Sequence, residues 1–68
     1  MTRKRRAKLQ SYELNKAKMW KDPAMVKFFV RCAHLIRPLS DMQWYGLRVV
    51  HGFDLVRKIK MDLGVNHD

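Results

Sequence analysis

The chain has 68 residues, of which 15 are Lys or Arg and 6 are Asp or Glu, so its formal net charge at pH 7 is +9. A chain of this length forms one domain whose core supplies roughly 3–5 kcal/mol of stability, which leaves little room for a rigid catalytic cleft, and we expect no enzyme. Because 47% of the residues are hydrophobic, the composition also excludes a fully disordered chain.

The single cysteine, Cys32, excludes an intramolecular disulfide framework and a multi-cysteine zinc site. A chain without disulfides is typical of a reducing compartment, so we expect a cytoplasmic protein. The longest run without a charged side chain, residues 42–47, is far shorter than the roughly 20 residues that a bilayer requires, and we expect no integral membrane association. His34 and His51 fall on different predicted helices, and we expect no metal and no cofactor.

The charge is distributed unevenly along the chain. Residues 1–21 contain eight basic residues and one acidic residue, a net charge of +7, whereas residues 22–68 contain seven basic and five acidic residues, a net charge of +2. This shift predicts two parts: a basic N-terminal arm, residues 1–21, and a nearly balanced, apolar body, residues 22–68.

The arm can be helical over residues 5–20, because no Gly or Pro interrupts it before Pro23. Four apolar residues could then share one face: Leu9, Tyr12, Met19 and Trp20. No residue provides a convincing cap at the start of the helix. An isolated helix of this length is marginal in water, so we expect a partly helical arm.

The first helix of the body is predicted over residues 23–37. Asp22 can cap its start, Pro23 suits the first helical position, and Pro38 disfavours helix at the residue before it. Apolar residues occupy most of the circumference of this helix, so that a single partner helix cannot cover it.

The second helix of the body is predicted over residues 41–63. Ser40 and Gln43 have the spacing of a capping box, and Gly64 suits a left-handed C-cap. Apolar residues at helical spacing run through the whole segment: Met42, Tyr45, Val49, Phe53, Val56, Ile59 and Leu63. Because this spacing continues across Gly52, we favour one continuous, bent helix, with a break at Gly52 as the alternative. The predicted fold is all-α, a helical hairpin of residues 23–37 and 41–63 preceded by the basic arm.

The basic arm is the first candidate site. Clustered cations neutralise phosphates and release counterions, which gives nucleic-acid affinity without sequence specificity. The run from residue 3 to residue 8 resembles the arginine-rich RNA-binding peptides of phage antitermination proteins, which become ordered in an RNA hairpin. This resemblance covers only the run and implies RNA rather than DNA. The candidate nucleic-acid-binding residues are Arg3, Lys4, Arg5, Arg6, Lys8, Lys16, Lys18 and Lys21.

A solvated tail that keeps the protein soluble, or contact with an anionic membrane surface or an acidic protein, would also explain the arm. Trp20 or Tyr12 is a candidate for stacking on bases.

The second candidate site is an apolar surface of the hairpin. Its helical spacing is typical of a core, but two helices cannot cover all of it, and surplus apolar surface on a small protein is commonly an interface. We therefore expect a homodimer or a subunit of a larger complex. The candidate interface residues are Met25, Phe28, Phe29, Trp44, Tyr45 and Val49.

Two functions follow from these two surfaces. The first is a small helical binding module that contacts nucleic acid or a ribonucleoprotein through the arm and self-associates or docks through the hairpin. The alternative is a small regulatory or inhibitory protein, of the kind that phages and mobile elements encode, that binds a host protein through the apolar face.

Overall fold

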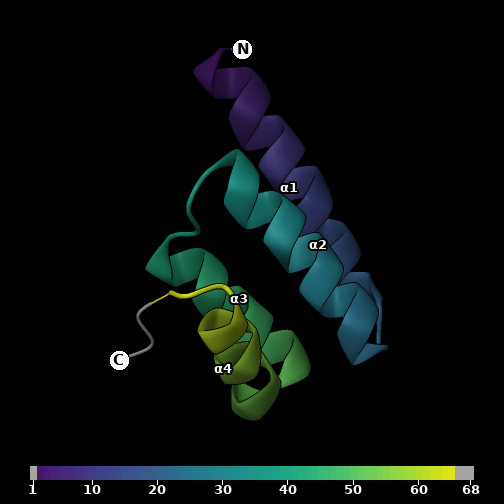
Figure 1. Cartoon of the computed structure of the whole chain (residues 1–68). Coiled ribbons are helices and arrows are strands. Elements are labelled where there is room, and N and C mark those ends of the chain that lie inside the picture. Colours follow the sequence, from purple (N-terminus) through teal and green to yellow (C-terminus); the bar gives the residue numbers. More distant parts are fainter. Residues whose placement is uncertain (1, 66–68) are drawn as a thin grey trace.

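The computed structural model describes residues 2–65, which form four helices and no strand (Figure 1). Helices α1 (Arg3–Met19) and α2 (Pro23–Ile36) lie side by side as a long antiparallel pair. Helices α3 (Asp41–His51) and α4 (Phe53–Asp62) form a second pair, in which α3 packs on α1 and α4 packs on α2. The predicted all-α fold is confirmed, and the basic arm itself forms half of a helical hairpin.

Local signals place the starts of α2 and α3 where the sequence predicts them. At α2, the carboxylate of Asp22 accepts the N–H of Ala24 at 3.0 Å. At α3, the hydroxyl of Ser40 accepts the N–H of Gln43 at 3.3 Å, and the side chain of Gln43 accepts the N–H of Ser40 at 2.9 Å. The predicted capping box is therefore confirmed, and it satisfies two backbone donors that the first turn would otherwise leave unpaired. Helix α2 ends at Ile36, one residue before the predicted boundary.

Helix α1 is better formed than the sequence indicates. The hydroxyl of Thr2 accepts the N–H of Arg5 at 3.2 Å and caps the start of the helix, a signal that the sequence analysis missed. Gln10, Leu14 and Ala17 are buried against the other helices. The arm and the body therefore differ in charge, but residues of both belong to one core.

The segment 41–63 is not one continuous helix, and the preference for one was wrong. Gly52 has φ 94° and ψ 160°, a conformation open almost only to glycine, and it separates α3 from α4. The break lets Val56 and Ile59 of α4 enter the core, where they are fully buried. The predicted C-cap is confirmed, because Gly64 has φ 74° and the N–H of Val65 donates to the carbonyl of Lys60 at 2.9 Å.

A buried glutamine joins α1, the end of α2 and the start of α3. The amide nitrogen of Gln10 donates to the carbonyl oxygens of Ala33, at 3.4 Å, and of Arg37. Its amide oxygen accepts from the side chain of Gln43 at 2.9 Å. Because these bonds pair the last carbonyls of α2, they anchor the backbone of Arg37 against α1.

Candidate nucleic-acid interface

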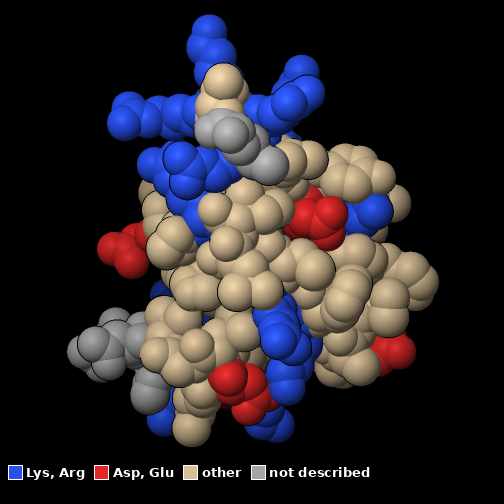
Figure 2. All heavy atoms as spheres, turned by 45° about the horizontal axis from the view of Figure 1, so that its top comes forward, with Lys and Arg blue, Asp and Glu red and all other residues tan. Residues whose placement is uncertain are grey.

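The first turns of α1 extend beyond the end of α2, so that this end of the helix stands out from the rest of the molecule (Figure 1). The four residues that begin the helix, Arg3, Lys4, Arg5 and Arg6, are all exposed, and no acidic residue occupies the first turn. Figure 2 shows Lys and Arg side chains gathered around this end, while the Asp and Glu side chains visible in that view lie below it.

This arrangement is electrostatically unfavourable for the helix itself. The N-terminus of a helix carries partial positive charge, so cations there typically cost 0.3–1 kcal/mol each at low ionic strength. Within residues 2–65, the one ion pair within 4 Å joins Lys27 to Asp62, so none of the four cations at the start of α1 has a carboxylate partner there. The charge at this end is available to an anionic ligand.

Arg37 adds a third guanidinium to two of these cations. Arg3, Arg6 and Arg37 line an open hollow of about 350 Å³, which we call the arginine hollow. The antiparallel packing of α2 on α1 returns the chain to the start of α1, and the hydrogen bond from Gln10 to the carbonyl of Arg37 keeps it there. Arg37 is not among the predicted candidate residues, because only the packing of α2 on α1 brings it next to Arg3.

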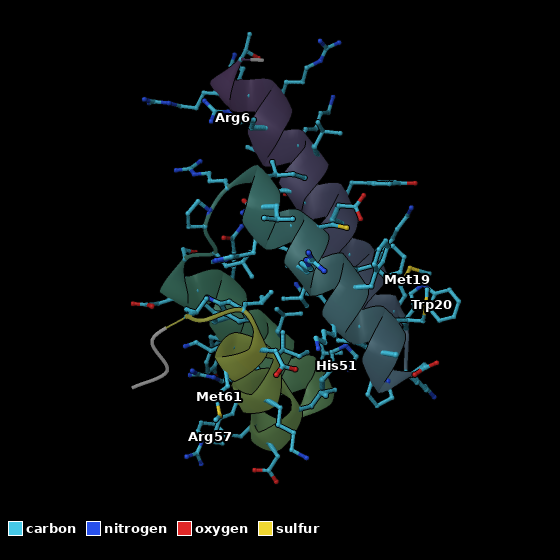
Figure 3. The ribbon with its side chains drawn as sticks, viewed as in Figure 1. Arg6, Met19, Trp20, His51, Arg57 and Met61 are labelled. Atoms are coloured by element: carbon cyan, nitrogen blue, oxygen red, sulfur yellow. The ribbon has the colours of Figure 1, made fainter. Side chains whose placement is uncertain are left out.

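A second, mostly apolar surface runs along the outward face of α1. Its larger part is a hollow of about 600 Å³, which we call the aromatic hollow, lined by Tyr12, Asn15, Lys16, Met19, Trp20 and Phe29. Next to it lies a hollow of about 460 Å³, the adjoining hollow, lined by Arg5, Lys8, Leu9 and Tyr12. The two hollows share Tyr12, and we refer to them together as the outward groove. Figure 3 shows Met19 and Trp20 together at one end of α1 and Arg6 near the other.

The aromatic rings of the groove are held by specific contacts. The ring of Trp20 stacks on that of Phe29, with 6.3 Å between the centroids and 23° between the planes. The ammonium of Lys16 lies 4.3 Å from the centroid of Tyr12 and 5.4 Å from that of Phe29. The groove therefore combines aromatic surface with a cation at close range.

The structure divides the eight predicted basic residues among different surroundings. Arg3 and Arg6 line the arginine hollow, while Arg5, Lys8 and Lys16 line the outward groove. The remaining three lie elsewhere. Lys4 is exposed in the first turn, Lys18 extends toward Gly46 of α3, and Lys21 is exposed in the turn after α1.

The predicted apolar interface residues do not form one surface. Phe29 and Trp44 are buried in the core, and Met25 is partly buried against it. Phe28 on α2 is exposed, as are Tyr45 and Val49 on α3. Two further exposed side chains are Met42 on α3 and Phe53 at the start of α4. The resulting set, which we call the α3 face, is Met42 (79% exposed), Tyr45 (60%) and Val49 (67%) of α3, together with Phe53 (57%).

The histidines have structural contacts. Nδ1 of His34 accepts the N–H of Leu39 at 3.3 Å, and Nε2 of His51 lies 2.6 Å from the carbonyl oxygen of Ala17. His67 lies outside the described residues. Among residues 2–65, no three His, Cys, Asp or Glu side chains are grouped so that they could hold a metal ion.

Comparison of the chain with models of protein families, with curated proteins and with solved structures found no match. In the part of the chain that the structure describes, no helix has both the length and the apolar character needed to cross a membrane.

Proposed function

We propose that this protein binds nucleic acid, RNA in preference to DNA, either free or within a ribonucleoprotein, through the basic start and the outward face of α1. The observation that carries the proposal is the group of four cations in the first turn of α1, which has no acidic residue to balance them. These cations oppose the dipole of their own helix, and a local conflict of this kind is expected where a ligand resolves it.

A polyanion resolves the conflict. Phosphates placed at the start of α1 would meet both the unpaired backbone N–H groups of the helix and the guanidinium groups around them. The arginine hollow supports the same proposal, because Arg37 adds a cation from a different helix. The contacts are made to the backbone of the nucleic acid, so we expect weak sequence preference. We place this activity in the cytoplasm, on the support of the single cysteine.

The test is the salt dependence of binding to a labelled single-stranded RNA 12-mer, measured by fluorescence anisotropy. A variant with Arg3, Lys4, Arg5 and Arg6 all changed to Gln keeps good helix formers in the first turn. If all four cations touch phosphates, the negative slope of log K against log salt should be less steep in this variant, by about 3.

The control removes the same charge from exposed positions on α2 and α4, by changing Lys27, Arg31, Arg57 and Lys58 to Gln. It should leave the slope within about 1 of the wild-type value. Equal losses of slope in the two variants would show that net charge alone explains the affinity, and an unchanged slope in the first variant would exclude the start of α1 from binding.

A second candidate function is docking on a protein, which the α3 face supports. Met42, Tyr45 and Val49 share one side of α3, and all four side chains of the set are exposed. Contiguous exposed apolar surface on a small protein is commonly an interface, either with a second copy or with a host protein that the chain would regulate. Static light scattering before and after nuclease treatment measures the oligomeric state, and a pull-down at high salt tests for capture of a host protein. A monomer that captures no protein would argue against this candidate.

A further inference from the structure

The outward groove of α1 has the composition of a site for unstacked bases. We propose that the aromatic hollow receives a nucleobase, so that the preferred ligand is a single strand or a looped-out base rather than a regular duplex. This inference rests on the proposed function and deepens it, since the cations at the start of α1 bind any polyanion, whereas an aromatic hollow distinguishes one from another.

The hollow presents rings from two helices and the turn between them. Phe29 of α2 is mostly buried and forms the floor, while Tyr12 of α1 and Trp20 of the turn are about half exposed. The volume of about 600 Å³ lies within the range of pockets that hold small planar ligands. Bases stack on such rings with a free energy of about 1–3 kcal/mol each, whatever the base.

The cations of the groove are placed for the phosphates of the same strand. Lys16 lies beside Tyr12 within the aromatic hollow, and Lys8 and Arg5 line the adjoining hollow, about one and two helical turns before Tyr12. From Arg5 to Trp20 the groove follows about 22 Å of helix at the usual rise of 1.5 Å per residue. Several nucleotides can therefore place bases on rings and phosphates on cations.

The position of the groove on α1 explains why these residues remain available. Gln10, Leu14 and Ala17 point into the core, and the spacing of an α-helix puts Arg5, Tyr12 and Lys16 on the opposite side. No residue that lines either hollow is acidic. A negatively charged strand therefore meets no carboxylate among the residues that line the two hollows.

The shape of the surface favours a base over a lipid bilayer. A bilayer is entered by apolar side chains that project from a convex face, whereas here the apolar surface is a recess between rings. A planar base can enter such a recess and pack against the faces and edges of its rings. Anionic vesicles are therefore the competing ligand in the test.

The experiment compares two 12-mers with equal numbers of phosphates, oligothymidine and an abasic oligomer, together with a 12-base-pair duplex. Binding is measured by fluorescence anisotropy on the full chain. Wild-type protein should bind oligothymidine about tenfold more tightly than the abasic strand, in keeping with one or two stacked bases. It should also bind oligothymidine more tightly than the duplex.

Variants assign the difference to the hollow. Tyr12→Ala should weaken binding of oligothymidine about fivefold or more and leave binding of the abasic strand unchanged, whereas Tyr12→Phe should behave as the wild type. The matched control is Leu35→Ala, which truncates a 73% exposed side chain on α2. Circular dichroism verifies that each variant is folded, which we expect because Tyr12 is outside the core.

Trp20 gives an independent readout. It is 45% exposed, whereas the other tryptophan, Trp44, is 3% exposed, so stacking of a base should quench mainly the emission of Trp20. Oligothymidine should quench the emission, the abasic strand should not, and Trp20→Phe should remove the effect.

Two results would overturn the inference while leaving the proposed function intact: equal affinity for oligothymidine and the abasic strand, or affinity for the duplex that equals that for the single strand. If neither these three ligands nor the single-stranded RNA 12-mer binds at low salt, the proposed function itself fails. Binding of phosphatidylserine vesicles that depends on Tyr12, without binding of oligothymidine or of the RNA 12-mer, would assign the groove to a lipid surface and overturn both proposals.

Discussion

Replacing each of the two glycines within residues 41–63 by alanine should change stability in opposite directions. Gly46 lies in the interior of α3, and a Cβ atom added there would meet only the end of the Lys18 side chain, with 3.4 Å to its nitrogen. That distance is an ordinary contact, so the variant keeps its fold and gains helix propensity. Gly46→Ala should raise the free energy of unfolding by about 0.5–1 kcal/mol.

At Gly52 the added methyl group meets open space, since no heavy atom beyond the adjacent residues lies within 4 Å of the Cβ position. The backbone, with φ 94° and ψ 160°, is nevertheless strained for any L-residue other than glycine. Gly52→Ala should therefore lower the free energy of unfolding by about 1–3 kcal/mol. The sign of each effect comes from backbone geometry alone, because neither methyl group causes a clash.

Urea denaturation followed by circular dichroism measures the free energy of unfolding of both variants. Thermal unfolding gives a second measure: in a domain of this size, 1 kcal/mol shifts the midpoint temperature by about 4–8 °C, so the two variants should be well separated. D-alanine at position 52, introduced by chemical synthesis, favours positive φ and should recover most of the loss. If Gly52→Ala is as stable as the wild type, helices α3 and α4 can join into one, and the reasoning about the break is wrong.

Three further predictions concern the network of Gln10, the arginine hollow and the core. Gln10→Ala should lower the free energy of unfolding by about 1–3 kcal/mol, because the carbonyl of Arg37 and the side-chain amide of Gln43 lose their partner. A loss below about 0.5 kcal/mol in urea denaturation would show that water replaces the side chain. Arg37→Gln should reduce the salt slope of RNA binding by about 0.7 in the anisotropy assay, while Arg31→Gln, which changes an exposed arginine of the same helix, should leave it unchanged. Leu47→Ala should cost about 2–5 kcal/mol, most of the stability of so small a domain, so that circular dichroism at 25 °C should detect extensive unfolding, unlike Leu35→Ala.

The sequence predicted those parts of the fold that depend on neighbouring residues. Asp22, the Ser40–Gln43 pair and Gly64 each act within one helical turn, and each has the predicted role. The break at Gly52 was not predicted, because the apolar spacing of the sequence continues from α3 into α4. Spacing reports which residues share a face of a continuous helix, but it does not report where the chain bends.

Spacing also failed to choose between the two sides of α3. Trp44 and Leu47 point into the core, while Tyr45 and Val49 face outward, and both pairs are apolar. The packing of α3 against both α1 and α4 decides which side is covered, and the location of α4 depends on the bend at Gly52. For the same reason Arg37 was absent from the candidate site, since its proximity to Arg3 depends on how α2 packs against α1.

The starts of the four helices, compared with one another, indicate that the basic turn of α1 is a local feature. Helix α2 begins with the carboxylate cap of Asp22, and the first turns of α3 and α4 contain Asp41 and Asp54. Each of these carboxylates lies where the dipole of its helix favours negative charge. If the basic residues of α1 reflected only the basic composition of the whole chain, basic residues would be expected at these three helix starts as well. Only at α1 are cations concentrated against the dipole, and there the helix extends beyond its neighbours with Arg37 beside its first turn (Figure 1). The unfavourable charge therefore lies where a phosphate can reach it, which supports a binding role for this end of α1 rather than a general effect of charge on solubility.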